Sequence, residues 1–99
     1  MDVTLLYFDG CPSWHKVDTH LTLLAAEHPE VRVTRLRVET PEEAERFGFH
    51  GSPSVMVDGR DAFDKPGLAV GLTCRRYATA AGYRGAPTLE QLREALGLA

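Results

Sequence analysis

The sequence predicts one α/β domain spanning residues 1–99, with a mixed four-stranded sheet, the order β-α-β-α-β-β-α, and helices on both faces of the sheet. Three observations support this fold class. Apolar, strand-like runs alternate with helical periodicity, two helical segments begin with a complete capping sequence, and an Asp-Gly pair separates two short strands. Strands joined through a helix pair in parallel and strands joined by a tight turn pair antiparallel, so the expected sheet is mixed.

The first half of the chain predicts a βαβ unit. Residues 2–8 form an apolar run typical of a buried strand, and Gly10 predicts the turn that ends it. From residue 12 to residue 28 apolar side chains recur every three or four positions, which indicates an amphipathic helix with Pro12 at its first position. Residues 31–38 alternate and are rich in β-branched side chains, which predicts a strand with one polar face at a sheet edge.

Turn and capping signals divide the second half. They predict a short helix over 41–47, strands over 54–58 and 61–63 around the Asp58-Gly59 turn, and a last helix over 88–97. Between the hairpin and the last helix the pattern weakens, because glycine and proline interrupt it repeatedly. A structureless loop of this length is uncommon in a small domain, so we expect a helical stretch over about 74–81 within it.

Composition excludes several classes of function. The 11 basic side chains against 14 acidic ones give a formal charge of −3, and no basic stripe is present, so nucleic acid is not an expected partner. The first apolar run lacks a preceding basic region and is broken at Asp9, which predicts neither a signal peptide nor a membrane span. We therefore expect a cytoplasmic protein without a membrane partner.

Cys11 is the candidate nucleophile. It lies between the first strand and the first helix, directly before Pro12, and unpaired amides at a helix start favour a thiolate over a thiol. Cys74 is the only other cysteine, and two cysteines without paired spacing predict neither a secreted disulfide framework nor a structural zinc site. The two residues are therefore expected to be chemical rather than structural.

Two motifs resemble the thioredoxin superfamily, specifically its small glutaredoxin-like members: Cys11-Pro12-Ser13-Trp14, and Gly51-Ser52-Pro53-Ser54-Val55. The resemblance implies a thioredoxin-like fold in which Pro53 is cis and lies against Cys11. It also implies that the backbone of Ser52 pairs with an extended thiol substrate. The whole chain is similar to a group of short thioredoxin-like proteins, some labelled alkylmercury-lyase-related and some with selenocysteine at position 11, which implies a nucleophile there.

Trp14 stands where the dithiol members have their resolving cysteine, and this departure leaves three interpretations open. Cys11 acts as a monothiol and an external thiol resolves its mixed disulfide, or Cys74 resolves it, or the domain is a redox-inactive binding module. Trp14 itself either packs in the core or shelters the thiolate. Arg75 and Arg76 either favour a thiolate at Cys74, or pair with a substrate carboxylate, or simply face solvent.

The sequence hypothesis is therefore a thiol–disulfide oxidoreductase without a bound cofactor, acting on a thiol or disulfide substrate such as glutathione or a partner protein. Its candidate catalytic residues are Cys11 and Cys74, and its candidate substrate-binding residues are Trp14, Ser52, Pro53 and Arg75. The alternative is a module that holds a soft metal ion or an organomercurial between the two thiolates.

Overall fold

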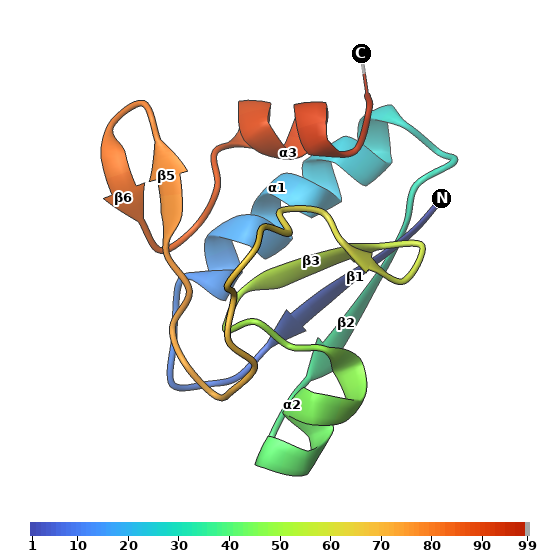
Figure 1. The fold of residues 1–99 in the computed structure, drawn as a ribbon. Helices are drawn as coiled ribbons and strands as arrows, with labels where there is room; N and C mark the ends of the chain where they lie inside the picture. Colours follow the sequence, from blue (N-terminus) through green and yellow to red (C-terminus); the bar gives the residue numbers. More distant parts are fainter. Residues whose placement is uncertain (99) are drawn as a thin grey trace.

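A computed structural model describes residues 1–98 and contains a mixed four-stranded sheet with three helices (Figure 1). The strands lie in the order β2-β1-β3-β4, with β1 parallel to β2 and antiparallel to β3, and with β3 antiparallel to β4. The elements are β1 (Asp2–Tyr7), α1 (Trp14–Glu27), β2 (Arg32–Arg37), α2 (Pro41–Phe47), β3 (Ser54–Val57), β4 (Arg60–Asp61), β5 (Tyr77–Thr79), β6 (Gly82–Arg84) and α3 (Leu89–Ala95).

Alternating side chains of β1 divide the core into two layers. Val3 and Leu5 face α1 and α3, whereas Leu6 faces α2 on the opposite side of the sheet, as the two-residue repeat of a strand requires. Figure 1 shows α1 and α3 together on one side and α2 on the other. The expected mixed sheet with helices on both faces is confirmed.

The helix starts follow the capping sequences. The hydroxyl of Thr40 accepts from the amide of Glu43 at 3.1 Å, and the hydroxyl of Thr88 accepts from the amide of Gln91 at 3.1 Å. α1 has no such cap and begins at Trp14, two residues later than predicted, because Pro12 and Ser13 form a turn before it.

The predicted helix over 74–81 is wrong. Tyr77–Thr79 and Gly82–Arg84 instead form an antiparallel hairpin, separate from the main sheet and lying beside the start of α1 (Figure 1). Aromatic and β-branched residues favour strands, and Gly82 adopts a φ of 97° at the turn, which a helix interior does not allow. The phenol of Tyr77 is also anchored on the carbonyl of Pro53, a long-range contact that fixes the first strand of the hairpin.

Candidate functional site

Cys11 lies in the short connection between β1 and α1. Its amide donates to the carbonyl of Phe8 at 3.3 Å, and the turn through Pro12 and Ser13 leads directly into the helix. The residue is only 2% exposed, and the side chain of Ser13 makes no capping hydrogen bond to the helix start. The first residue of α1, Trp14, therefore follows the buried cysteine after two turn residues.

Cys74 reaches Cys11 from the opposite end of the sequence. The two residues are joined by a disulfide, their Cα atoms are 5.6 Å apart, and 63 positions separate them in the chain. Cys74 is exposed, whereas Cys11 is buried beneath it. One of the three interpretations left open by the sequence requires a second cysteine of the chain close to Cys11. The geometry provides that cysteine, because Cys74 is bonded to Cys11.

The Ser52-Pro53 peptide bond is cis, as the resemblance implies. Both residues are buried at the start of β3, and the hydroxyl of Ser52 accepts from the amide of Phe8 at 3.2 Å. We call residues 51–54 the proline loop. This loop is thus hydrogen-bonded directly to the connection that carries Cys11.

The backbone of Ser52 is already paired within the chain. Its amide donates to the carbonyl of Thr73 at 2.7 Å, and its carbonyl accepts from the amide of Arg75 at 2.9 Å, which gives an isolated parallel bridge between Ser52 and Cys74. We call residues 73–75 the Cys74 segment. In the disulfide-bonded protein this segment occupies the backbone groups that the resemblance assigns to an extended substrate.

Gly51 allows the Cys74 segment to approach closely. Its φ is 104°, and a Cβ at this position would lie 3.0 Å from the hydroxyl and 3.1 Å from the carbonyl oxygen of Thr73. We expect Gly51→Ala to lower the free energy of unfolding by about 1–3 kcal/mol beyond the backbone penalty, because the added methyl group overpacks this contact.

Gly82→Ala is the matched control. Its φ of 97° is close to that of Gly51, but the nearest atom to an added Cβ there is Arg84 Nη1 at 3.7 Å, an ordinary contact. Both variants carry the penalty of a positive φ, about 1 kcal/mol, so their difference in urea unfolding measures the contact with the Cys74 segment. Equal destabilisation of the two variants would contradict the close approach.

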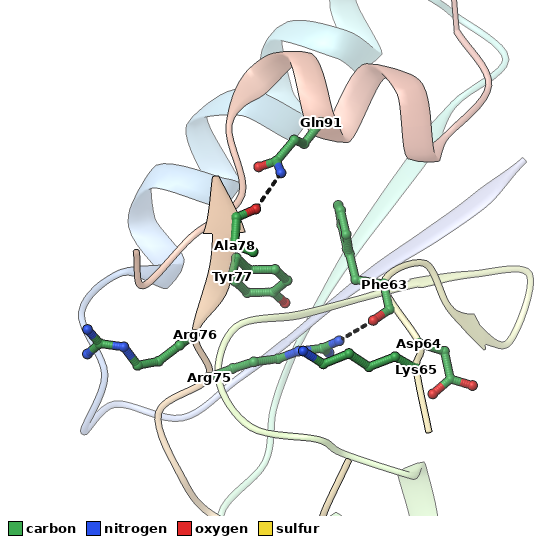
Figure 2. A pocket seen from close by; sticks show the side chains of 8 residues that line it. All are labelled: Phe63, Asp64, Lys65, Arg75, Arg76, Tyr77, Ala78 and Gln91. Atoms are coloured by element: carbon green, nitrogen blue, oxygen red, sulfur yellow. Dashed lines mark hydrogen bonds between the residues drawn. The ribbon is translucent and has the colours of Figure 1, made fainter. Parts of the chain in front are cut away.

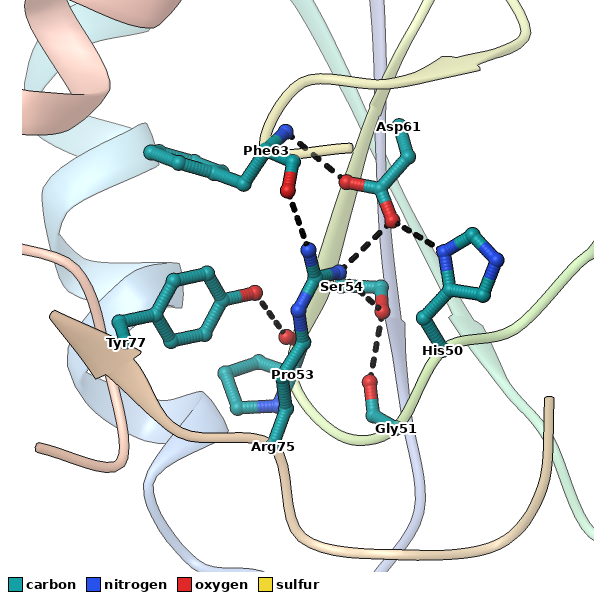
Figure 3. A network of polar contacts seen from close by, with 8 residues as sticks. All are labelled: His50, Gly51, Pro53, Ser54, Asp61, Phe63, Arg75 and Tyr77. Atoms are coloured by element: carbon teal, nitrogen blue, oxygen red, sulfur yellow. Dashed lines mark hydrogen bonds and ion pairs between the residues drawn. The ribbon is translucent and has the colours of Figure 1, made fainter. Parts of the chain in front are cut away.

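Arg75 does not face solvent, unlike Arg76. Its guanidinium donates to Asp61 Oδ2 at 2.7 Å and to the carbonyl of Phe63 at 2.8 Å, and the side chains of Arg75 and Asp61 are 5% and 4% exposed. Figure 3 shows His50 on the same carboxylate, with Nδ1 at 2.7 Å from Oδ2. This buried network ties the Cys74 segment to β4 and to the proline loop.

The same guanidinium contacts two further groups of the network. It donates to Ser54 Oγ at 3.2 Å, and its central carbon lies 4.9 Å from the centre of the Tyr77 ring. Burial raises the pKa of the Tyr77 phenol, whose hydroxyl donates to the Pro53 carbonyl. The sequence assigned Arg75 to substrate binding, whereas its head group has partners within the chain.

The charge of Asp61 makes the stability of the fold depend on pH in the acid range. Burial alone raises the pKa of its carboxyl, but hydrogen bonds from Arg75, His50 and the Phe63 amide outweigh that effect and hold the pKa below its ordinary value of 3.8. The stabilisation is therefore complete at pH values above 3.8 and is lost as the pH falls through the lower value of the folded state.

The measurement is the free energy of unfolding between about pH 6 and pH 2 for the wild-type protein and Asp61→Asn. The stability difference between the two proteins should be largest at the upper end and shrink on acidification. A difference that stays constant over this range would show that the Asp61 charge does not stabilise the fold.

Trp14 is half-buried beside the main core. Its ring stacks on Tyr7, with ring centres 4.0 Å apart, and on His15 at 3.8 Å. Trp14 therefore has the packing role considered in the sequence analysis, and it contacts Tyr7, the last residue of β1.

A cavity of about 300 Å³ is lined by residues 63–65, by residues 75–78 and by Gln91 of α3. Figure 2 shows Phe63, Lys65 and Tyr77 around it, and the amide of Gln91 donates to the Ala78 carbonyl at its edge, 2.8 Å away. The side chain of Arg76 points away from that of Lys65 in this view. The cavity therefore lies next to the residues that follow Cys74, and the two exposed cations do not converge in it.

Within residues 1–98, no group of three or more His, Cys, Asp or Glu side chains is placed to hold a metal ion. No helix in this part of the chain has the length and apolar character needed to cross a membrane.

Sequence reasoning did not identify Asp61 and Tyr77 as part of the site. Asp61 follows the Asp58-Gly59 turn and looks like an ordinary surface carboxylate in the sequence. Asp61 matters because it pairs with Arg75, which lies 14 positions later in the sequence. The residues between the two form no regular helix or strand. No local pattern carries that information.

Comparison of the chain with protein-family models, curated proteins and solved structures found no match.

Proposed function

We propose that the chain is a thiol–disulfide oxidoreductase with a thioredoxin-like fold, in which Cys11 is the nucleophile and Cys74 resolves its mixed disulfide. The observation that supports this most strongly is the disulfide itself. It joins a buried cysteine before a helix to an exposed cysteine on a segment paired with the proline loop. A metal or cofactor has no part in the proposed chemistry.

The proposed reaction has two exchange steps. The Cys11 thiolate attacks one sulfur of a substrate disulfide, so that a mixed disulfide forms and one substrate thiolate leaves and takes up a proton from water. The Cys74 thiolate then attacks Cys11 Sγ, closes the Cys11–Cys74 disulfide and releases the second substrate thiolate. The substrate gains two electrons and the protein loses two.

Two molecules of an external thiol such as glutathione, or one dithiol partner protein, reduce the protein again. The exposed Cys74 is the side of the disulfide that an incoming thiolate meets first. Cys11 then leaves as a thiolate, and a leaving thiol of lower pKa departs faster. The amino end of α1, which follows Cys11, favours this thiolate through its unpaired amides and positive dipole end.

Substrate docking on Ser52 requires displacement of the Cys74 segment, because that segment uses both backbone groups of Ser52. An extended peptide or glutathione is the substrate class that fits a single exposed backbone edge. We expect this chemistry to operate in the cytoplasm, where thiols are kept reduced.

The test is a stoichiometric reaction of the reduced protein with oxidised glutathione, followed by acid quenching and non-reducing peptide mapping. We expect each chain to reduce one molecule of oxidised glutathione and to form the Cys11–Cys74 disulfide through a transient adduct at Cys11. A stable adduct at Cys11 would assign resolution to an external thiol, and no reaction at either cysteine would reject the oxidoreductase.

A further inference from the structure

The Cys74 segment is attached to the rest of the fold at three points of different chemistry. Cys74 is bonded to Cys11, the backbone of residues 73 and 75 pairs with Ser52, and the side chain of Arg75 enters the buried network. Reduction breaks only the first attachment. The position of the segment in the reduced protein therefore depends on the other two, and on the flanking bonds of the Gly71 amide to the Phe49 carbonyl and of the Tyr77 phenol to the Pro53 carbonyl.

The Arg75 side chain is the stronger of the remaining attachments. The net contribution of the two backbone hydrogen bonds is modest, because water can pair with the freed Ser52 groups once the segment has moved away. The guanidinium, in contrast, is held by Asp61, Ser54 and the Phe63 carbonyl (Figure 3). Withdrawing it would leave the buried Asp61 carboxylate without its charged partner, which is strongly unfavourable.

We propose that the Asp61–Arg75 ion pair is a latch that keeps the Cys74 segment docked on Ser52 after the disulfide is reduced. Asp61 is then a positioning residue for the resolving thiol. This role rests on the proposed oxidoreductase function, but the docking itself does not.

The latch has two opposite consequences for the chemistry. It holds the Cys74 thiol next to Cys11, which raises its effective concentration for closing the disulfide. It also covers Cys11 and Ser52, so that an external disulfide reaches them only while the segment is open. Weakening the latch should therefore make the first exchange step faster and disulfide closure weaker.

Two backbone amides measure docking directly. The Ser52 amide donates to Thr73 and the Arg75 amide donates to Ser52, so both are protected from hydrogen exchange only while the segment is docked. The Val38 amide, which donates to Tyr7 at 2.7 Å at the far edge of the sheet, is the internal reference. The experiment compares the reduced wild-type protein with reduced Asp61→Asn.

Asp58→Asn is the matched control. This carboxylate lies in the turn between β3 and β4, is exposed and does not contact Arg75, and asparagine tolerates its φ of 48°. We expect both reporting amides to stay protected in the reduced wild-type protein and in reduced Asp58→Asn. In reduced Asp61→Asn the exchange of both amides should accelerate by a factor at least about tenfold larger than that of Val38.

Loss of protection in the wild-type protein on reduction, or equal protection in reduced Asp61→Asn, would overturn the latch. Should Asp61→Asn not fold, Arg75→Met provides the same test, because it keeps an unbranched side chain and removes the guanidinium from both Asp61 and the Tyr77 ring. The exchange measurement involves no redox turnover, so its outcome is independent of whether the oxidoreductase proposal holds.

A second readout separates positioning from a purely structural role. In glutathione redox buffers, Asp61→Asn should lower the equilibrium constant for closing the Cys11–Cys74 disulfide by about tenfold. The rate of mixed-disulfide formation at Cys11 should rise in the same variant. A general loss of structure would also expose Cys11, but it would remove the protection of the Val38 amide as well, so the pattern shows positioning where Val38 stays protected. Unchanged values of both quantities would contradict the positioning role.

Discussion

Cys11→Ser is expected to abolish disulfide reduction by this protein. A serine hydroxyl is not ionised at neutral pH and forms no disulfide, so neither the first exchange step nor the return of the protein to its oxidised form remains. The assay is reduction of oxidised glutathione with a thiol donor present, scored against the wild-type rate. Retention of the full rate would refute the assignment of Cys11.

Cys74→Ser is the informative partner of that variant, because it removes a sulfur from the same disulfide. The first step remains possible and the second does not, so a glutathione adduct should accumulate at Cys11 and persist until an external thiol removes it. The two variants lack the same disulfide and differ in the step they block. An adduct that forms at Cys74 of Cys11→Ser and not at Cys11 of Cys74→Ser would reverse the roles of the two residues.

Loss of the disulfide is expected to lower the free energy of unfolding by about 4 kcal/mol. The bond joins residues 63 positions apart, and in the chain-entropy model a closed loop of this size restricts the unfolded chain by about that amount at 25 °C. Domains of this size have total stabilities of about 5–15 kcal/mol, so the redox state should change the unfolding midpoint strongly.

The measurement is urea unfolding of the oxidised protein, the reduced protein and the double variant Cys11→Ser/Cys74→Ser. The reduced protein and the double variant should have the same free energy of unfolding, about 4 kcal/mol below that of the oxidised protein. A difference below about 1 kcal/mol would show that the unfolded chain is already restricted in other ways.

Local signals were sufficient for the sheet and its helices. Thr40 with Glu43, and Thr88 with Gln91, define two helix starts through side chains that are three positions apart, and the Asp58-Gly59 turn defines the antiparallel pair β3-β4. The alternation in residues 31–38 also predicted an edge strand, which the structure confirms as β2. In each case the determining contacts lie close together in the sequence.

The segment between β4 and α3 could not be predicted in the same way. Its path is set by contacts over long sequence separations, among them Tyr77 on Pro53 and Arg75 on Asp61. Glycine and proline within it suppress periodicity, so the short hairpin β5-β6 gave no clear strand pattern. The pairing of Cys11 with Cys74 stayed open for the same reason, because a disulfide requires close approach and only the path of this segment provides it.

The arginine next to Cys74 illustrates the limit of residue-type reasoning. Two adjacent arginines suggest a solvated pair, and Arg76 is indeed exposed. Arg75 is 6% exposed, because Asp61 and the Phe63 carbonyl provide a buried receptor for its guanidinium. The sequence placed Arg75 among the substrate-binding residues, whereas its guanidinium binds a carboxylate and a carbonyl within the chain.

The account depends on Cys11 being an activated thiol in the reduced protein. The most direct test is the rate of alkylation of each cysteine as a function of pH, followed by peptide mapping with a small reagent. We expect the Cys11 profile to have its midpoint clearly below the ordinary thiol value of about 8.5. Coverage by the Cys74 segment lowers the absolute rate, and burial disfavours the thiolate, so a low midpoint would show that the amino end of α1 outweighs the effect of burial. A Cys11 midpoint at or above the ordinary value would contradict the account and favour a binding role for the domain.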